Sequence, residues 1–307
     1  MPAPAPPLAL TMILNIQGAA FYNSFEWENI PDPTHGRVNY VDRRTSQEQN
    51  LTFANADTFI LRADSTSFLN PSGPGRNSVR IRSRRAYTTH VAVFDIRHMP
   101  QGCGTWPAVW EVQGSNWPYG GEVDILEGVN DEGPNAATLH TGPGCTMPTS
   151  REGFSGVRVE NNCDATVNGN VGCPVRFPSP ASYGPSFNAI GGGFYAMERT
   201  PSFIKVWHWA RDDASVPNEV KFGNGGGGVS PDNWGAPIAL FPNNQCNINQ
   251  HFGPHNIVIN LTLCGDWAGS VYAQSGCPST CVDFVNGNPQ AFAQAYFDIA
   301  GVRVYEQ

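Results

Sequence analysis

The chain has 307 residues and a net charge of −8; 14% of its residues are charged and 40% are hydrophobic. This composition excludes intrinsic disorder, and the 33 glycines and 26 prolines indicate a folded β-protein with long loops. The acidic balance, without a long run of Lys or Arg, argues against a nucleic-acid partner, and no segment reaches the 18 apolar residues needed to span a membrane.

The first 15 residues form an atypical segment. Residues 2–7 are rich in Pro and Ala, and residues 8–16 are short and mostly apolar. No basic residue precedes the apolar stretch and no clear cleavage site follows it, so the segment is at best a poor signal peptide. An artefact of the gene model explains it equally well. We therefore expect an N-terminal segment over 1–15 and a single domain over 16–307.

Period-two alternation is frequent along the rest of the chain, whereas amphipathic helical periodicity is hard to find. Turn-rich stretches separate the alternating runs, at 70–75, 191–193 and 225–228. The sequence shows no internal repeat and no linker. Many short strands with such turns predict an all-β sandwich. The clearest predicted strands are 79–83, 90–96 (almost wholly apolar, as if buried on both faces), 203–209, 255–263 and 296–305.

Eight cysteines indicate disulfides and an oxidising compartment. Their number is even, no two are spaced as Cys-x-x-Cys, and no histidines are placed among them as a zinc site requires. Free thiols in a cytosolic protein are the alternative. The pairing stays open, because eight cysteines allow 105 connectivities. The sequons at Asn50 and Asn260 agree with secretion, although such triplets are common by chance.

The segment 120–128 carries the most informative pattern, since three carboxylates fall within six residues of an apolar strand. They are Glu122, Asp124 and Glu127. A solvent-facing charged strand is the alternative interpretation, but the acids have no Lys or Arg partner nearby in sequence. Burying charges is costly unless they are paired or used, so the pattern favours a functional site.

The spacing of these acids predicts a backbone irregularity. Glu122 and Asp124 are two residues apart and therefore share a face of the strand. Glu127 is an odd number of residues from Glu122, so a regular strand would turn it to the opposite face. One extra residue in a β-bulge restores the common face, and bulges are frequent beside active sites. We expect this bulge around Ile125 and Leu126.

Tryptophans just before the acids suit a sugar ligand, because apolar sugar faces stack on flat indole rings. Trp106 and Trp110 are four residues apart and share a strand face, and Trp117 follows them. Burial in the core is the alternative for each of the three. His140 lies in another predicted strand, where a lone histidine is more often structural than functional.

The chain resembles glycoside hydrolase family 16 in its bulged, laminarinase-type form, because Glu122-Val-Asp-Ile-Leu-Glu127 is the signature of that family. The resemblance runs from about Ile16 to the C-terminus and extends to the basidiomycete laminarinases, which are endo-1,3(4)-β-glucanases. Five further segments are similar to theirs: Asp32-Pro-Thr-His-Gly-Arg-Val-Asn-Tyr-Val41, Ser72-Gly-Pro-Gly-Arg-Asn-Ser-Val-Arg-Ile-Arg82, Met99-Pro-Gln-Gly-Cys-Gly-Thr-Trp-Pro107, Asn135-Ala-Ala-Thr-Leu-His-Thr141 and Cys264-Gly-Asp-Trp-Ala-Gly269.

The resemblance implies a β-jelly-roll sandwich of two antiparallel sheets with a concave glycan-binding cleft. It implies a secreted monomer that hydrolyses β-1,3-glucans and mixed β-1,3/1,4-glucans with retention, without a cofactor or metal. Glu122 is then the nucleophile, Glu127 the general acid and later the base, and Asp124 the supporting carboxylate. Glu127 must start protonated, so we expect burial and nearby negative charge to raise its pKa.

The resemblance also implies a set of substrate-binding residues, to which Trp106 is added from its spacing. Trp110 and Trp117 would stack on sugars upstream of the cleaved bond, where Arg80 and Asn39 would contact hydroxyls. Trp267 would form a wall on the leaving-group side, and His140 would border the cleavage site.

Two rival functions stay open at this point. One is a transglycosylase on the same fold, which product analysis would reveal by longer oligosaccharides. The other is a non-catalytic β-glucan-binding protein; such proteins usually lack one of the acids, and this chain has all three. Linkage preference and structural calcium also stay open.

Overall fold

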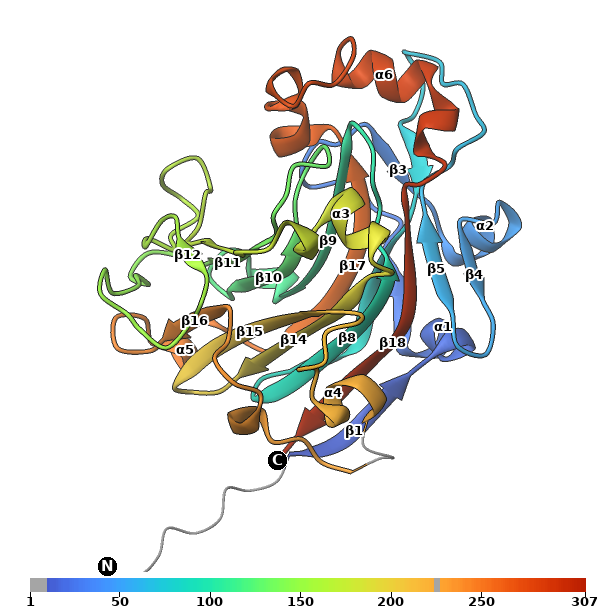
Figure 1. Cartoon of the computed structure of the whole chain (residues 1–307). Helices are drawn as coiled ribbons and strands as arrows, with labels where there is room; N and C mark the ends of the chain where they lie inside the picture. Colours follow the sequence, from blue (N-terminus) through green and yellow to red (C-terminus); the bar gives the residue numbers. More distant parts are fainter. Residues whose placement is uncertain (1–9, 224–226) are drawn as a thin grey trace, which may run out of the picture.

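The computed structural model describes residues 10–223 and 227–307, and within them two eight-stranded antiparallel sheets pack face to face (Figure 1). This confirms the predicted all-β sandwich. One sheet has the order β16-β15-β14-β8-β18-β5-β4, with β1 also paired to β18. Its strands are β1 (Thr11–Ile16), β4 (Thr52–Ala54), β5 (Phe59–Arg62), β8 (His90–His98), β14 (Gly193–Arg199), β15 (Phe203–Ala210), β16 (Ala239–Pro242) and β18 (Tyr296–Glu306).

The other sheet has the order β12-β13-β11-β10-β9-β17-β7-β2 and carries the acidic strand. Its strands are β2 (Phe25–Trp27), β7 (Arg80–Tyr87), β9 (Thr105–Val112), β10 (Glu122–Glu127), β11 (Ala136–His140), β12 (Val157–Arg158), β13 (Val175–Arg176) and β17 (His255–Leu263). A parallel pair, β3 (Val38–Tyr40) and β6 (Arg76–Ser78), stands beside it.

The α-helices of the described residues are short and lie in the connections. They are α1 (Phe21–Ser24), α2 (Arg43–Glu48), α3 (Gly184–Ala189), α4 (Asn218–Phe222), α5 (Ile248–His251) and α6 (Cys281–Gly287). None of the helices in the described ranges is long and apolar enough to cross a membrane.

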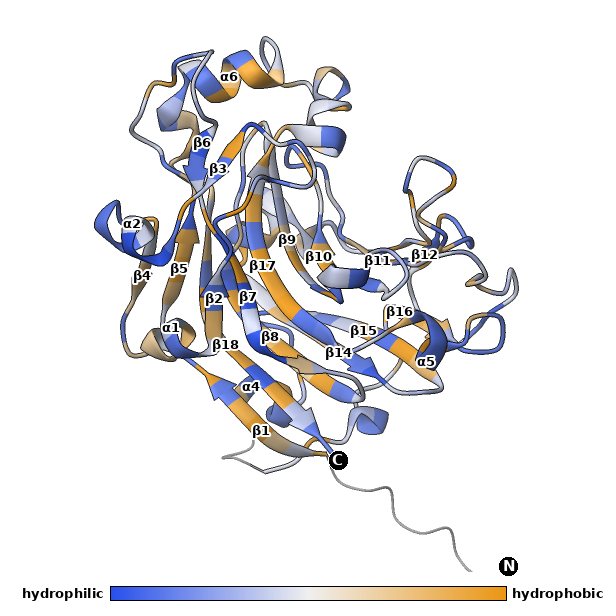
Figure 2. Cartoon of the chain, turned by 180° about the vertical axis from the view of Figure 1, so that it is seen from behind, coloured by the Kyte–Doolittle hydropathy of each residue, from blue (hydrophilic) through white to orange (hydrophobic). Residues whose placement is uncertain are grey.

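The main core lies between the two sheets. Inward residues of β10 and β17, such as Val123 and Ile259, join Phe94 of β8 in one buried cluster, and Figure 2 shows the hydrophobic run along β17. Strand β8 is buried on both faces, as its apolar run predicts. Its alternate residues Val91 and Val93 pack outside the sandwich, in a second cluster with Trp207, Trp209 and Trp234.

Part of the atypical N-terminal segment is described in the structure. Strand β1 begins at Thr11 and pairs with β18 along its length, so part of the atypical segment joins the sheet. Residues 1–9 of that segment lie outside the described residues, as does part of the turn-rich stretch 225–228.

All eight cysteines form disulfides, which confirms that part of the sequence analysis. Cys103–Cys277 and Cys264–Cys281 fasten the segment 264–281, and the other two fasten the long connections on the opposite side of β10. Those two are Cys145–Cys246 and Cys163–Cys173.

Candidate active site on β10

The predicted bulge is confirmed in β10. Asp124 lies opposite Trp110 of β9, and the next pair is Leu126 with Val109, so Ile125 is the extra residue. Ile125 and Leu126 are both fully buried in the core, and the strand resumes its alternation one residue later. Glu127 is thereby turned to the same side as Glu122.

The register of the sheet gathers the polar residues on one face, because directly opposite residues of antiparallel strands point the same way. Asp124 is opposite Trp110, which is opposite Val258, which is opposite Arg82. His140 is opposite Glu122 by the same rule. These positions lie on the face of the sheet that is turned away from the core.

Burial is the main cause of unusual protonation among the three acids. Asp124 is 2% exposed and the two glutamates are partly buried. Burial raises the pKa of Glu122, Asp124 and Glu127 to about 8, and the charge of Asp124 raises the pKa of both glutamates further. Near neutral pH the cluster therefore holds protons, so that one carboxyl group can act as an acid while another is ionised.

Two indole groups bind the two glutamates. Trp106 Nε1 donates a hydrogen bond to Glu127 Oε1 over 2.8 Å, and a hydrogen bond from Trp117 lowers the pKa of Glu122. Trp106 in turn meets the ring of Trp267 edge to face, with 5.7 Å between centroids. Trp117 is 44% exposed and Trp267 is 38% exposed, so both present ring surface beside the acids.

His140 lies between the acids and a disulfide loop. Its Nε2 is 3.3 Å from Asp124 Oδ2, and its Nδ1 is 2.8 Å from Asn170 Oδ1. An amide oxygen only accepts, so Nδ1 carries a proton and Nε2 faces Asp124. Asn170 belongs to the loop that Cys163–Cys173 closes. Gly172 lets that loop approach, since a Cβ there would lie 2.8 Å from His140 Cε1.

Trp110 is fixed by its neighbours on the sheet. Its Nε1 donates to Asn260 Oδ1 over 2.7 Å, and the guanidinium of Arg80 lies 5.0 Å from the centre of its ring. Arg80 is itself paired with Glu28 over 2.6 Å, and Asn260 Nδ2 donates to Tyr40 Oη over 3.1 Å.

One predicted binding residue is not brought to this group. Asn39 alternates with Tyr40 on β3, and its Nδ2 donates to Asn77 Oδ1 over 2.6 Å. Tyr40 is the residue of β3 that reaches the sheet face, through Asn260. The other nine predicted residues lie on or beside the acid-bearing face, and the roles given to them stay predictions.

The sequence reasoning missed Asn260 and Asn135. Asn260 is 5% exposed and both its amide atoms are bonded, whereas the sequence marks it only as part of a sequon. Its place in the alternation of 255–263, on the same face as Asn256 and Thr262, was the available signal. Asn135 is fully buried and bonds to the backbone of β10. No pattern in the sequence marks that contact, because it depends on the bulge.

One group of possible metal donors occurs among the described residues. Glu122, Asp124 and His140 each offer an atom within 4.8 Å of the others. The expectation of no metal stays a prediction.

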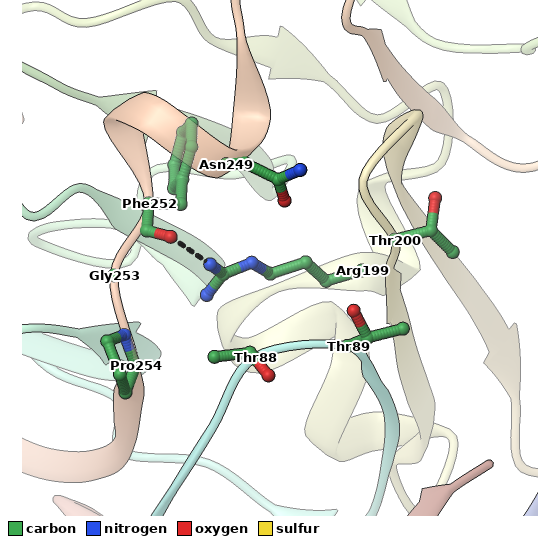
Figure 3. A pocket seen from close by; sticks show the side chains of 8 residues that line it. All are labelled: Thr88, Thr89, Arg199, Thr200, Asn249, Phe252, Gly253 and Pro254. Atoms are coloured by element: carbon green, nitrogen blue, oxygen red, sulfur yellow. Dashed lines mark hydrogen bonds between the residues drawn. The ribbon is translucent and has the colours of Figure 1, made fainter.

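One pocket lies away from the acids and is lined by Arg199, Phe252 and Gly253 among others (Figure 3). Arg199 extends across it and donates a hydrogen bond to the carbonyl of Phe252. None of the other residues drawn there is an Asp or a Glu. The adjoining Gly253 donates to the carbonyl of Gly120 over 2.9 Å. The wall of this pocket is therefore hydrogen-bonded to the turn before Glu122. A second pocket, lined by Glu28, Arg82, Gln113, Gly114, Ser115, Pro254 and Asn256, includes residues of the acid-bearing face.

Comparisons with known proteins agree with this geometry. A family model described as the XgeA-like catalytic domain of glycoside hydrolase family 16 matches residues 25–305. The structure superposes with a TM-score of 0.95 on laminarinase 16A of Phanerochaete chrysosporium, at 60% identity over 97% of this chain and 100% of that one. That protein holds 6-O-glucosyl-laminaritriose in both donor and acceptor sites.

Two more distant proteins add to the comparison. A family 16 elongating β-1,3-glucosyltransferase matches with a TM-score of 0.89 and 36% identity, over 97% of this chain and 100% of that one. A probable glycosidase of Schizosaccharomyces pombe is 40% identical over 299 residues, which is 96% of this chain and 69% of that protein. The chain spans only 45% of a probable endo-1,3(4)-β-glucanase of Aspergillus clavatus, at 39% identity over 302 residues, or 94% of this chain.

Proposed function

The chain belongs to glycoside hydrolase family 16, and from this premise we propose that it is a secreted endo-β-glucanase that hydrolyses β-1,3-glucans with retention of configuration. The observation that carries the proposal is the bulged strand β10, which turns two glutamates an odd number of residues apart to one face. Retaining glycosidases need two carboxyl groups that reach the same sugar from one site. The four disulfides agree with secretion into an oxidising compartment.

The first step transfers the sugar to the enzyme. A carboxylate oxygen of Glu122 attacks the anomeric carbon, and the bond from that carbon to the leaving oxygen breaks. Glu127 gives its proton to the leaving oxygen, which its raised pKa allows near neutral pH. The indole of Trp106 then stabilises the carboxylate that forms on Glu127, because it donates a hydrogen bond to it.

The second step releases the sugar. Glu127 gave up its proton in the first step and is now a carboxylate that can accept one. Glu122 carries no charge in the covalent intermediate, so the charge repulsion between the two glutamates is removed. Water then bonds to the anomeric carbon, its proton passes to Glu127, and the ester bond to Glu122 breaks. Asp124, whose Oδ2 lies 3.3 Å from His140 Nε2, is the supporting carboxylate beside Glu122 in both steps.

We assign glucan binding to the aromatic residues on either side of the acids. Trp110 and Trp117 offer faces for sugars upstream of the cleaved bond, and Trp267 with Trp106 forms the downstream side. The β-1,3 linkage is taken over from the Phanerochaete chrysosporium protein, which binds a laminaritriose derivative. Asn260 fixes the indole of Trp110, so replacement of Asn260 is expected to weaken substrate binding.

The decisive experiment uses Glu122→Ser. The variant should lose laminarin cleavage while still binding laminarin in a pull-down assay, because the nucleophile is removed and the aromatic residues are kept. Proton NMR of the wild-type products should show the β-anomer first. Cleavage of laminarin by Glu122→Ser at the wild-type rate, or first release of the α-anomer, would refute the proposed mechanism.

Transglycosylation is the second candidate, favoured by the match to an elongating β-1,3-glucosyltransferase. The partly exposed Trp267 could hold an acceptor sugar in place of water. Mass spectrometry of laminarin digests at modest substrate concentration separates the two reactions. Hydrolysis gives mainly shorter oligosaccharides, whereas longer ones as the main product would favour the transferase. Parallel digests of lichenan test the mixed-linkage activity.

A further inference from the structure

Asn135 is fully buried, and each of its four polar groups has a partner. Its Oδ1 accepts from the backbone N–H of Glu127 over 2.9 Å, and its Nδ2 donates to the carbonyl of Ile125 over 2.8 Å. Its own N–H donates to Ser182 Oγ over 3.0 Å, and its carbonyl accepts from Phe177 N–H over 2.8 Å. The side chain therefore has one orientation, set by its own backbone contacts.

The two side-chain bonds replace a missing piece of the sheet. The ladder between β10 and β11 ends where Asp124 faces Thr138. If the register continued, Glu127 would lie opposite Asn135, and their backbones would pair. The extra residue Ile125 breaks that register. The side-chain amide of Asn135 offers one donor and one acceptor, as a backbone peptide group does. It bonds the backbone on either side of the bulge in place of the missing strand pairing.

We propose that Asn135 is a positioning residue, which holds the β10 bulge in place and thereby aims Glu127 at the bound sugar. This inference rests on the proposed role of Glu127 as acid and base. Asn135 bonds to the backbone of Glu127 and acts on the reaction only through it.

Asn135 is needed because β10 could also pair with β11 as a regular ladder without the bulge. Without the amide, the carbonyl of Ile125 and the N–H of Glu127 are left buried without these partners, which is unfavourable for each group. Slippage to a regular ladder would restore partners for these groups, but it would turn Glu127 to the core side of the sheet. Asn135 removes the advantage of that slippage.

The test separates proton transfer from general damage by the choice of leaving group. Laminarin has a sugar leaving group, which needs the proton from Glu127. An aryl β-laminaribioside with 2,4-dinitrophenol does not, because that phenolate leaves unaided. We compare kcat/KM for both substrates in wild type, Asn135→Ala and Glu127→Ala. The matched control is Asn188→Ala, whose amide also bonds the backbone N–H and carbonyl of one residue, Met99, and whose remaining bond is to Gln101 rather than to β10.

Asn135→Ala is expected to lose at least about tenfold more kcat/KM on laminarin than on the aryl substrate, as general acid catalysis supplies about 10²–10⁴-fold. Glu127→Ala should show the same selectivity, and Asn188→Ala should keep the wild-type ratio between substrates. Equal losses of Asn135→Ala on both substrates, or full laminarin activity, overturn the inference. Equal losses of Glu127→Ala on both substrates would instead overturn the proposed function, so the two failures are distinguishable.

A second variant covers the case in which Asn135→Ala folds poorly. Asn135→Asp has the same shape and still accepts from the Glu127 N–H, but it can donate to the carbonyl of Ile125 only when protonated. For each pH we divide kcat/KM on laminarin by kcat/KM on the aryl substrate, and we compare this selectivity between the variant and wild type. The selectivity of Asn135→Asp should approach that of wild type at low pH and fall below it as pH rises. A selectivity relative to wild type that stays constant across the pH range overturns the inference.

Discussion

At the residue scale, the site depends on how each carboxyl group is bonded. Trp106 donates to Glu127, and this hydrogen bond lowers the pKa of that glutamate against the larger effect of burial. The sequence presented Trp106 only as a ring at strand spacing from Trp110. Its contact with Glu127 gives it a chemical role as well.

Replacement of Trp106 tests this role. Trp106→Phe keeps a ring but removes the donor, so the pKa of Glu127 should rise further and the alkaline limb of kcat/KM should move to higher pH. We also expect kcat on laminarin to fall about 3–10-fold, since a charge-assisted hydrogen bond is lost. The matched control is Trp110→Phe, which loses its bond to Asn260 and should raise KM without moving the limb. An unmoved limb in Trp106→Phe would count against the assignment.

The two sequons should behave differently. Asn50 is exposed, whereas Asn260 is 5% exposed and has both amide atoms bonded on the acid-bearing face. A glycan on Asn260 would need both bonds broken. We expect mass spectrometry of peptides from the protein secreted by a fungal host to find glycan on Asn50 and none on Asn260. Glycan on Asn260 would contradict the arrangement around Trp110.

At the scale of elements, the disulfide loop 163–173 reaches β11 through Gly172. This glycine has φ of +66°, and a Cβ there would lie 2.6 Å from the carbonyl oxygen of Leu139. Gly169 in the same loop has φ of +67° and open space around it. A comparison of substitutions at these two glycines separates the effect of backbone strain from the effect of close approach to His140.

Gly172→Ala should therefore cost more than Gly169→Ala. Left-handed backbone strain costs about 1–2 kcal/mol in either variant. Gly172→Ala should lose about 1–2 kcal/mol more in the free energy of unfolding, because the loop must withdraw from Leu139. Its kcat should fall as well, since Asn170 moves with the loop and leaves His140. Denaturant unfolding and laminarin kinetics measure both effects, and equal behaviour of the two variants would contradict this account.

At the scale of the whole molecule, the acid cluster makes folding depend on pH. In the folded protein the cluster of Glu122, Asp124 and Glu127 retains protons up to about pH 8, whereas the unfolded chain releases them near their ordinary pKa values of 4.5 and 3.8. The folded state then binds more protons, so the free energy of unfolding falls as pH rises from about 4 to 8. The three acids thus destabilise the fold that positions them.

Glu122→Gln should relieve part of this cost. At pH 7 we expect the variant to be about 2 kcal/mol more stable than wild type, and at pH 4 the difference should vanish because wild-type Glu122 is protonated in both states. Thermal unfolding across the pH range measures it. Replacement of an exposed residue, Glu152→Gln, is the control. It should leave the pH dependence of thermal unfolding close to that of wild type. A stability gain that is the same at pH 4 and pH 7 would contradict the explanation.

The sequence by itself determined the class of fold, the presence of disulfides, the acidic strand and its bulge. These follow from local rules: alternation sets the face of each strand residue, and the odd spacing of two acids on one face requires an extra residue. The family signature added the expected roles of the acids, and the tryptophan spacing added candidates beside them.

Only the tertiary structure decided which partners complete the site. Asn260 reaches Trp110 from β17, Asn170 reaches His140 from a disulfide loop, and Asn135 bonds the bulge. Asn39, whose contact with sugar stays a prediction, bonds Asn77. These contacts join residues up to 150 positions apart, and strand order and register, which local patterns do not encode, decide which side chains meet.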